Sequence, residues 1–249
     1  MIISHKYKFI FIKPTKVAGT SIEIALAKHC GKKDIITPIT KYNPSSDSEK
    51  YKQPIKNYEE LSFYNHIGPY DIKQKIGKEV WDNYYKFTVV RNPWDQAVSR
   101  FFWNKKGSKF PLKKNIITII FSNLLNPKAY ISVFTKLKVL VKKSLRLNKT
   151  EFDKFIMSFN KNWTNTKYYF DKKGEPICDF YIRYENLEKD YEKVCNKLGI
   201  LYEKLPKTKD KQRKEKKHYS VYYNKKTKDK IESLFQKEID FFNYKFKKN

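Results

Sequence analysis

KFIFIKPTKVAGTSIEIAL, residues 8–26, is the stretch of sequence that decides the fold. It opens with a short apolar run at residues 9–12, which is typical of a strand covered on both faces. Pro14 ends that run, and apolar residues at helical spacing resume after Ser21. The stretch therefore predicts a buried strand, a turn and an amphipathic helix, in that order.

The turn between this strand and helix carries groups that favour an anion. Gly19 lets the backbone turn tightly and approach a ligand closely. Thr20 and Ser21 place hydroxyl and N–H groups at a helix N-terminus, where the helix dipole attracts negative charge. Lys16 adds a full positive charge. The candidate anion-binding residues of this loop are Lys16, Val17, Ala18, Gly19, Thr20 and Ser21.

The loop differs from the nucleotide-hydrolysing pattern GxxxxGK[ST], in which the lysine follows the second glycine. Here Lys16 precedes Gly19, and no earlier glycine accompanies it. Taken alone, the stretch fits equally well an ordinary strand, turn and helix with a surface lysine.

A second segment of the same design is KFTVVRNPWDQAVSRFF, residues 86–102. Its apolar start, residues 87–90, predicts another buried strand. Arg91 lies at the end of that strand, where its planar guanidinium can grip a phosphate with two hydrogen bonds. Asn92 is a favourable N-cap for the helix that follows, and Ser99 lies on the polar flank of that helix.

Lys16 and Arg91 each follow a predicted strand, and ligands of open α/β sheets bind at the carboxyl ends of the strands. The two segments therefore predict one site for a nucleotide with more than one anionic group. The expected fold class is α/β, with a central parallel sheet flanked by helices and a P-loop-like nucleotide-binding site. Residues 1–249 are expected to form one domain, with a helical insertion at about 104–150. Residues 32–60 are expected to be a loop.

KVAGTS followed by VVRNPWDQAVSRFF resembles the sulfotransferase family, in particular its carbohydrate-type branch with the heparan-sulfate 2-O-sulfotransferase-like enzymes. The resemblance extends over most of the chain. It implies the sulfotransferase variant of the α/β fold and an O-sulfotransferase activity. The sulfuryl donor would be 3′-phosphoadenosine-5′-phosphosulfate (PAPS), and the favoured acceptor would be a carbohydrate hydroxyl, which makes a glycan the expected partner.

The same resemblance implies roles for single residues. The first loop, with Lys16, would hold the 5′-phosphosulfate of PAPS, and Arg91 and Ser99 would hold its 3′-phosphate. Tyr184 matches a tyrosine that lies against the adenine in relatives. Arg213 lies in a basic tract whose counterpart in relatives contributes a cation to the 3′-phosphate.

Two residues are candidates for catalysis. His66 matches a region that often carries a basic histidine in relatives, and an imidazole titrates near neutral pH. A histidine bonded to a loop carbonyl is the structural alternative, and Glu59 or Glu60 stays open as the base because some sulfotransferases use a glutamate. Lys16 can stabilise the charge that develops on the leaving oxygen. The expected reaction needs no metal.

The chain is strongly basic, with 54 Lys and Arg against 26 Asp and Glu, a net charge of +28. Such a charge favours an anionic partner, although much of it is expected to be solvated surface. Two alternatives stay open: a basic module that binds nucleic acid or a membrane surface, and a nucleotide kinase with an atypical P-loop. No nucleic-acid partner is expected, because no nucleic-acid-binding motif occurs.

The cysteines Cys30, Cys178 and Cys195 show no metal-binding spacing, and their odd number favours free thiols in a reducing compartment. No signal-peptide pattern occurs, so a soluble, cytoplasmic protein is expected. Residues 116–147 mix lysines with apolar residues and suggest either helices that cap the core or a peripheral contact with a membrane. Nothing in the sequence indicates an oligomeric state.

Overall fold

The computed structural model of the protein describes residues 1–39, 54–105, 149–206, 208 and 217–248. Its centre is a five-stranded mixed sheet with the strand order β3-β1-β2-β4-β5. The strands are β1 (Ile2–Ser4), β2 (Phe9–Phe11), β3 (Ile35–Ile36), β4 (Tyr85–Val90) and β5 (Phe180–Arg183). Strands β2, β4 and β5 run parallel, whereas β1 is antiparallel to both of its neighbours.

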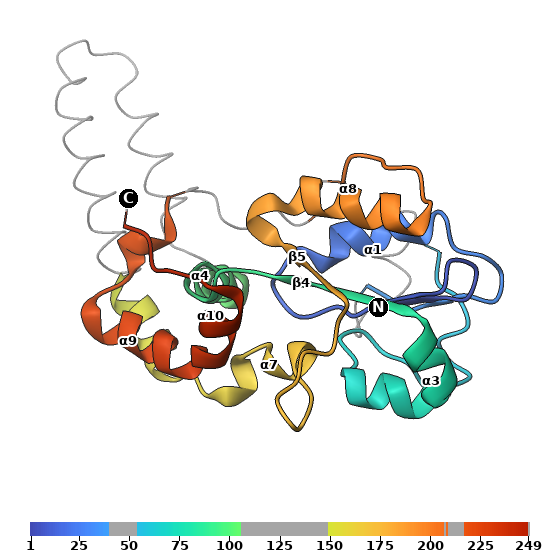
Figure 1. Ribbon diagram of the computed structural model, residues 1–249. Coiled ribbons are helices and arrows are strands. Elements are labelled where there is room, and N and C mark those ends of the chain that lie inside the picture. The colour runs from blue at the N-terminus through green and yellow to red at the C-terminus, as the bar shows by residue number, and fades with distance from the viewer. Residues whose placement is uncertain (40–53, 106–148, 207, 209–216, 249) are drawn as a thin grey trace, which may run out of the picture.

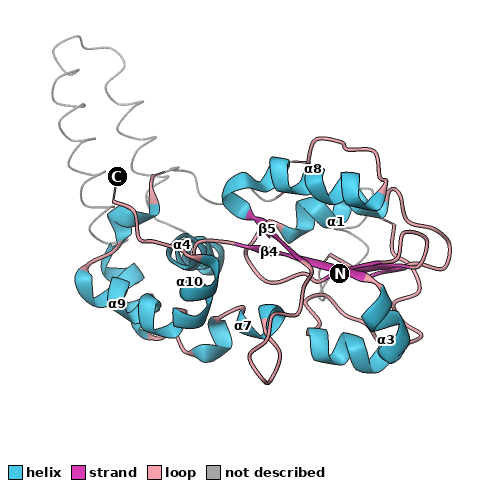
Figure 2. Cartoon of the chain, viewed as in Figure 1, coloured by secondary structure: helices cyan, strands magenta, loops and turns pink. Residues whose placement is uncertain are grey.

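Helices cover both faces of this sheet. The α-helices that lie wholly within the described residues are α1 (Gly19–Ala27), α3 (Pro69–Asn83), α4 (Pro93–Asn104), α7 (Thr166–Tyr169), α8 (Leu187–Leu198), α9 (Lys225–Leu234) and α10 (Gln236–Phe242). Short 3₁₀ turns are η2 (Lys161–Trp163), η3 (Tyr184–Asn186) and η5 (Tyr219–Tyr222). Helices α1 and α8 lie on one side of the sheet and α3 on the other, while α4, α9 and α10 gather at one end (Figure 1). Figure 2 shows the strands between these layers.

Strand β2 is covered on both faces, as its continuous apolar sequence predicts. Phe9 and Phe11 pack into the cluster that includes residues of α1 and α8. Ile10 and Ile12 pack into the opposite cluster, with residues of α3 and α4. Successive side chains of a strand point to opposite faces, so an uninterrupted apolar run indicates burial on both sides. This strand forms the floor from which the first loop rises.

The predicted α/β class, the two buried strands and the two helices that follow them are confirmed. Asn92 caps α4 as expected, since its side chain accepts hydrogen bonds from the backbone N–H groups of Trp94 (3.1 Å) and Asp95 (3.4 Å). The expectation of a parallel sheet is wrong for one half of it. Strand β1 lies at the very start of the chain, before the predicted strand at residues 9–12, and β3 lies within the expected loop at residues 32–60.

These two strands are hard to recognise because they are three and two residues long. Their pairing depends on partners elsewhere in the chain: Ile2 stands opposite both Phe11 and Ile36. A hydrophobic period needs a longer run to be recognised.

The other structural expectations concern the insertion and the cysteines. Almost all of the expected insertion, residues 106–148, and with it the proposed membrane contact, lies outside the described residues. Within the described ranges, no helix is long and apolar enough to cross a bilayer. The three cysteines are free, with Cys178 and Cys195 buried and Cys30 half-buried.

Candidate functional site

The loop between β2 and α1 turns by means of two residues in the left-handed region, Lys16 with φ 64° and Ala18 with φ 65°. A residue with a side chain held there typically costs about 1–3 kcal/mol, which the surrounding structure must offset. Ala18 is the N-cap of α1, and within the described structure no side chain caps the helix. The first N–H groups of α1 therefore keep the character of an anion-binding helix N-terminus.

Gly19 is required by close packing inside the protein. A Cβ atom at Gly19 would lie 2.9 Å from Cγ of Lys13 and 3.7 Å from the ring of Phe11. The sequence favoured a role in turning the loop and approaching a ligand. The structure assigns the left-handed turns to Lys16 and Ala18, and makes Gly19 the point where α1 crosses the side chain of Lys13.

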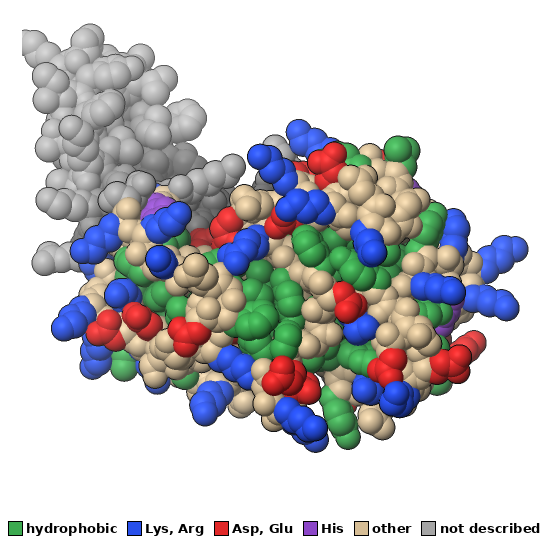
Figure 3. Space-filling model, viewed as in Figure 1, with side chains coloured by type: hydrophobic (Ala, Val, Ile, Leu, Met, Phe, Trp, Pro, Cys, Tyr) green, Lys and Arg blue, Asp and Glu red, His purple; other side chains and the backbone are tan. Residues whose placement is uncertain are grey.

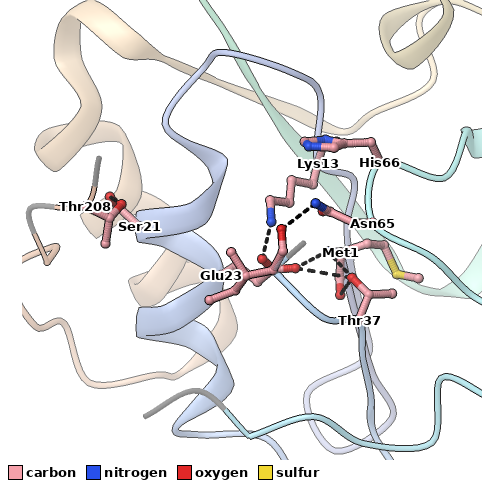
Figure 4. Close-up of polar contacts among 9 residues, drawn as sticks. Met1, Lys13, Ser21, Glu23, Thr37, Asn65, His66 and Thr208 are labelled. Carbon is pink, nitrogen blue, oxygen red and sulfur yellow. Dashed lines mark hydrogen bonds and ion pairs between the residues drawn. The ribbon is translucent and has the colours of Figure 1, made fainter. Parts of the chain in front are cut away.

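Lys13 is a buried cation below the loop, which the sequence did not single out. Its ammonium forms an ion pair with Glu23 of α1, and both side chains are buried (Figure 4). Glu23 also contacts the backbone nitrogen of Met1 and lies 3.4 Å from Oγ1 of Thr37. Burial raises the pKa of Glu23, but the charges of Lys13 and of the Met1 nitrogen and the hydrogen bonds from both together outweigh it, so the pKa stays below its usual value. Lys13 is thus neutralised inside the fold.

Lys16 joins the two predicted segments. Its backbone carbonyl accepts a hydrogen bond of 3.0 Å from Nη1 of Arg91. Its ammonium lies 3.9 Å from the ring centre of Trp103, which is part of α4. The structure therefore brings Lys16 and Arg91 together, although they are 75 positions apart in the sequence.

The guanidinium of Arg91 is held by hydrogen bonds along its edge and by an aromatic ring against its flat face. Its Nε and Nη2 atoms donate to one oxygen of Asp95 over 2.9 and 2.7 Å. The ring of Tyr184, at the end of β5, lies 3.8 Å from the guanidinium carbon. These contacts fix the plane of the guanidinium, and Arg91 as a whole is only 8% exposed. Ser99 is half-buried on α4, about two turns beyond Arg91.

The basic tract that includes Arg213 is mostly outside the described residues. Thr208 of this tract is described, and its Oγ1 lies 2.7 Å from Oγ of Ser21 in the first turn of α1 (Figure 4). Arg213 itself lies outside the described residues.

His66 lies beside the same loop, on the side of Lys13. Its Nδ1 atom is 2.8 Å from the backbone carbonyl of Lys13. A carbonyl oxygen only accepts hydrogen bonds, so Nδ1 carries the proton and Nε2 carries the lone pair. Burial and the charge of Lys13 lower the pKa of His66 to about 3. The imidazole is therefore neutral at pH 7, with Nε2 as its basic atom. The expectation that it titrates near neutral pH is wrong, because burial and the charge of Lys13 disfavour its charged form.

The two alternative bases, Glu59 and Glu60, lie in a different environment from that of His66. Glu59 and Glu60 are exposed, and Glu59 accepts a hydrogen bond of 2.8 Å from the hydroxyl of Tyr58. The hydrogen bond of His66 to the carbonyl of Lys13 is also the contact expected of a histidine with a purely structural role. The same contact sets the tautomer that a general base requires.

Asn165 and Tyr168 support the loop from the other side, and the sequence did not single them out. Asn165 accepts hydrogen bonds from N and Oγ1 of Thr15 (3.2 and 3.0 Å) and donates one to its carbonyl (2.9 Å). Tyr168 donates to the carbonyl of His66 over 2.8 Å. Arg100 of α4 donates to Oγ1 of Thr15. Arg100 could have been found as a second cation on the polar flank of α4, next to Ser99.

The surface charge is spread out. Figure 3 shows Lys and Arg side chains distributed over the visible face, with Asp and Glu side chains between them. Where the structure describes the chain, no group of three or more His, Cys, Asp or Glu side chains is arranged to hold a metal ion.

Comparison with known proteins agrees with this fold. The model of the sulfotransferase family matches residues 1–245, so the chain belongs to the sulfotransferase family. Membership of that family makes it a transferase of sulfuryl groups, and the five-stranded mixed sheet with flanking helices is consistent with the sulfotransferase fold. The family generally uses PAPS.

A relative from Archaeoglobus fulgidus, described only as an uncharacterized protein, is 27% identical over 135 residues. That alignment covers 52% of this chain and 79% of the relative. No solved structure matches the chain.

Proposed function

We propose that this sulfotransferase is a PAPS-dependent O-sulfotransferase of the carbohydrate-type branch, whose acceptor is a carbohydrate hydroxyl. The observation that carries the proposal is the hydrogen bond of 3.0 Å between Arg91 and the carbonyl of Lys16. It joins an open helix N-terminus to a guanidinium of fixed orientation. A nucleotide with an anionic group at each end needs two such centres.

The residues present fit the donor. The N–H groups at the start of α1 and the ammonium of Lys16 suit the 5′-phosphosulfate. Arg91 and Ser99 suit the 3′-phosphate, and Tyr184, stacked on Arg91, adds an aromatic ring next to it. When bound, the donor supplies an activated sulfuryl group and a phosphate leaving group.

Lys16 is suited to move toward an anion. Its contact with the ring of Trp103 is a cation–π interaction, worth about 1 kcal/mol at a partly exposed site. A hydrogen bond from a charged group to a phosphate oxygen is worth about 1.5–3 kcal/mol. Binding of an anion at the start of α1 would therefore outweigh the contact with Trp103 and draw the ammonium to the leaving oxygen.

His66 is the proposed general base. It is neutral at pH 7, and its lone pair is on Nε2, because Nδ1 donates to the carbonyl of Lys13. Tyr168 holds the backbone of His66 through a hydrogen bond of 2.8 Å. Nε2 can then take the proton of the acceptor hydroxyl as that oxygen attacks sulfur.

Calorimetric titration with the desulfated nucleotide 3′-phosphoadenosine-5′-phosphate tests the donor site. We expect micromolar binding to the wild type and at least about tenfold weaker binding to Arg91→Lys, because lysine keeps the charge but loses the planar fork. Lys225→Ala, which removes an exposed cation of α9, should bind as the wild type does. A folded wild type that does not bind the nucleotide would overturn the proposal. Transfer from PAPS to carbohydrates, compared with tyrosyl peptides, tests the acceptor class.

A further inference from the structure

Arg100 is a half-buried cation beside the loop that the proposed donor site does not use. Of its five N–H donors, Nη2 is the one bonded within the described part of the chain, to Oγ1 of Thr15. Its Nε atom is buried and has no hydrogen-bond partner among the described residues. None of the ion pairs between described residues includes Arg100. A half-buried guanidinium with this little compensation is suited to an anionic ligand.

The guanidinium is held in place by neighbours that form no ion pair with it among the described residues, although the buried carboxyl of Glu238 lies close enough to interact with its charge. Its carbon lies 5.4 Å from the ring centre of Trp163, which is itself stacked on Phe159 at 5.1 Å. Thr15, which accepts from Arg100, is fixed in turn by Asn165. The orientation of Arg100 is therefore set by aromatic and neutral polar groups.

Contacts of the loop indicate which substrate Arg100 faces. The carbonyl of Lys16 faces Arg91, on the side proposed for the nucleotide. Thr15 faces Arg100 and Asn165. Tyr168 connects that second group to the base, because it donates to the backbone of His66 and also lies close to Arg100. Arg100 is thus on the side of the loop where the acceptor hydroxyl must lie to reach His66.

We propose that Arg100 binds an anionic group of the acceptor, a carboxylate or a sulfate or phosphate ester, and makes the enzyme prefer acidic acceptors. This inference rests on the proposed sulfotransfer for the side of the loop that it assigns to the acceptor. The anion site itself can be measured without turnover.

The test uses inorganic sulfate as the probe of the anion site and 3′-phosphoadenosine-5′-phosphate as the probe of the donor site. Sulfate is titrated into protein saturated with the nucleotide, at constant ionic strength, for the wild type, Arg100→Gln, Arg100→Lys and Lys167→Gln. We expect Arg100→Gln to weaken sulfate binding at least about tenfold and nucleotide binding less than about twofold. The sulfate affinity of Arg100→Lys should lie between those of Arg100→Gln and the wild type.

Lys167→Gln is the matched control, because Lys167 is an exposed cation on α7, next to the same group of residues. It should leave both affinities unchanged, which separates a local site from a general effect of net charge. Circular dichroism checks that each variant is folded. If Arg100→Gln does not fold, Arg100→Lys carries the comparison.

A second measurement compares a uronic-acid disaccharide with its carboxyl-reduced neutral counterpart as acceptors. The wild type should favour the acidic sugar at least about tenfold in kcat/KM, and Arg100→Gln should nearly abolish that preference. Equal sulfate binding by wild type and Arg100→Gln would overturn the inference, as would a loss of nucleotide binding in Arg100→Gln. A folded wild type that binds sulfate through Arg100 but no nucleotide would keep the anion site and remove the proposed donor.

Discussion

At the scale of single residues, the site depends on the different environments of two lysines three positions apart. Lys13 is 1% exposed and is paired with Glu23, so its charge serves the fold. Lys16 follows in a left-handed turn, which carries its side chain away from Glu23 and onto the ring of Trp103. The backbone conformation of the loop thus separates a structural cation from the proposed catalytic one.

Replacing Lys16 by methionine tests its proposed catalytic role. We expect kcat to fall by about 10²–10³, the usual effect of removing one group that stabilises a developing oxyanion. Steady-state rates with PAPS give the comparison, and Lys33→Met, at an exposed position, is the control. An unchanged kcat would assign Lys16 to binding alone.

His66 leads to a prediction about pH. Burial keeps the pKa of His66 at about 3, below its ordinary value of 6.5. Between these two values the unfolded chain binds a proton at this residue and the folded chain does not, so its contribution to stability is complete above pH 6.5 and is lost as the pH falls toward 3. Urea unfolding at pH 4, 5 and 7 should show a larger acid loss for wild type than for His66→Gln. A pKa near 6.5 for His66, measured by NMR titration, would contradict this prediction.

At the scale of elements, β2, its loop and α1 form one unit whose closest contact is at Gly19. The helix crosses Lys13 with no space for a Cβ, and the ion pair with Glu23 ties the end of that lysine to the same helix. Close packing therefore fills the space between Gly19 and Lys13, whereas the N-terminus of α1 can still accept an anion.

Gly19→Ala should destabilise the protein by about 1–3 kcal/mol, because Cγ of Lys13 must move from a buried position. Gly31→Ala is the matched control, since its nearest neighbour would be 3.5 Å away, an ordinary contact. Denaturant unfolding of both variants gives the comparison. Equal stability of Gly19→Ala and the wild type would show that the helix can shift without penalty.

At the scale of the whole molecule, the C-terminal helices support the first loop through a chain of polar contacts. Glu238 of α10 is buried and accepts a hydrogen bond of 2.7 Å from Thr166. The neighbouring Asn165 holds Thr15 of the loop, 150 residues earlier in the sequence. Substitutions in the C-terminal helices can therefore alter the geometry of the site.

Glu238→Gln tests this connection through pH. Burial raises the pKa of Glu238 from 4.5 to about 7, so the folded protein holds a proton there that the unfolded chain has lost. The stability of the wild type should therefore fall, at this residue, as the pH rises from 4.5 to 7. In thermal unfolding, the stability of Glu238→Gln relative to that of the wild type should increase from pH 5 to pH 8. Glu232→Gln, on the surface of α9, should show no such trend.

Much of the fold could be predicted where a signal lies within a few neighbouring residues. The apolar runs before Pro14 and Arg91 identified β2 and β4, and Asn92 identified the start of α4. The same local patterns brought Lys16 and Arg91 forward as candidates, and the parallel pairing of β2 with β4 places them together.

The tertiary structure alone decided the rest, because the deciding partners are distant in sequence. The short strands β1 and β3 pair with each other, β1 pairs with β2, and β3 also bridges to Lys56. The burial of Lys13, the tautomer of His66 and the placement of Arg100 beside Thr15 depend on contacts between separate elements. The sequence by itself determined which segments fold locally and which cations follow the strands, since those signals act over a few residues. Only the tertiary structure decided which charges are neutralised inside and which face a ligand, because burial is a property of the assembled fold.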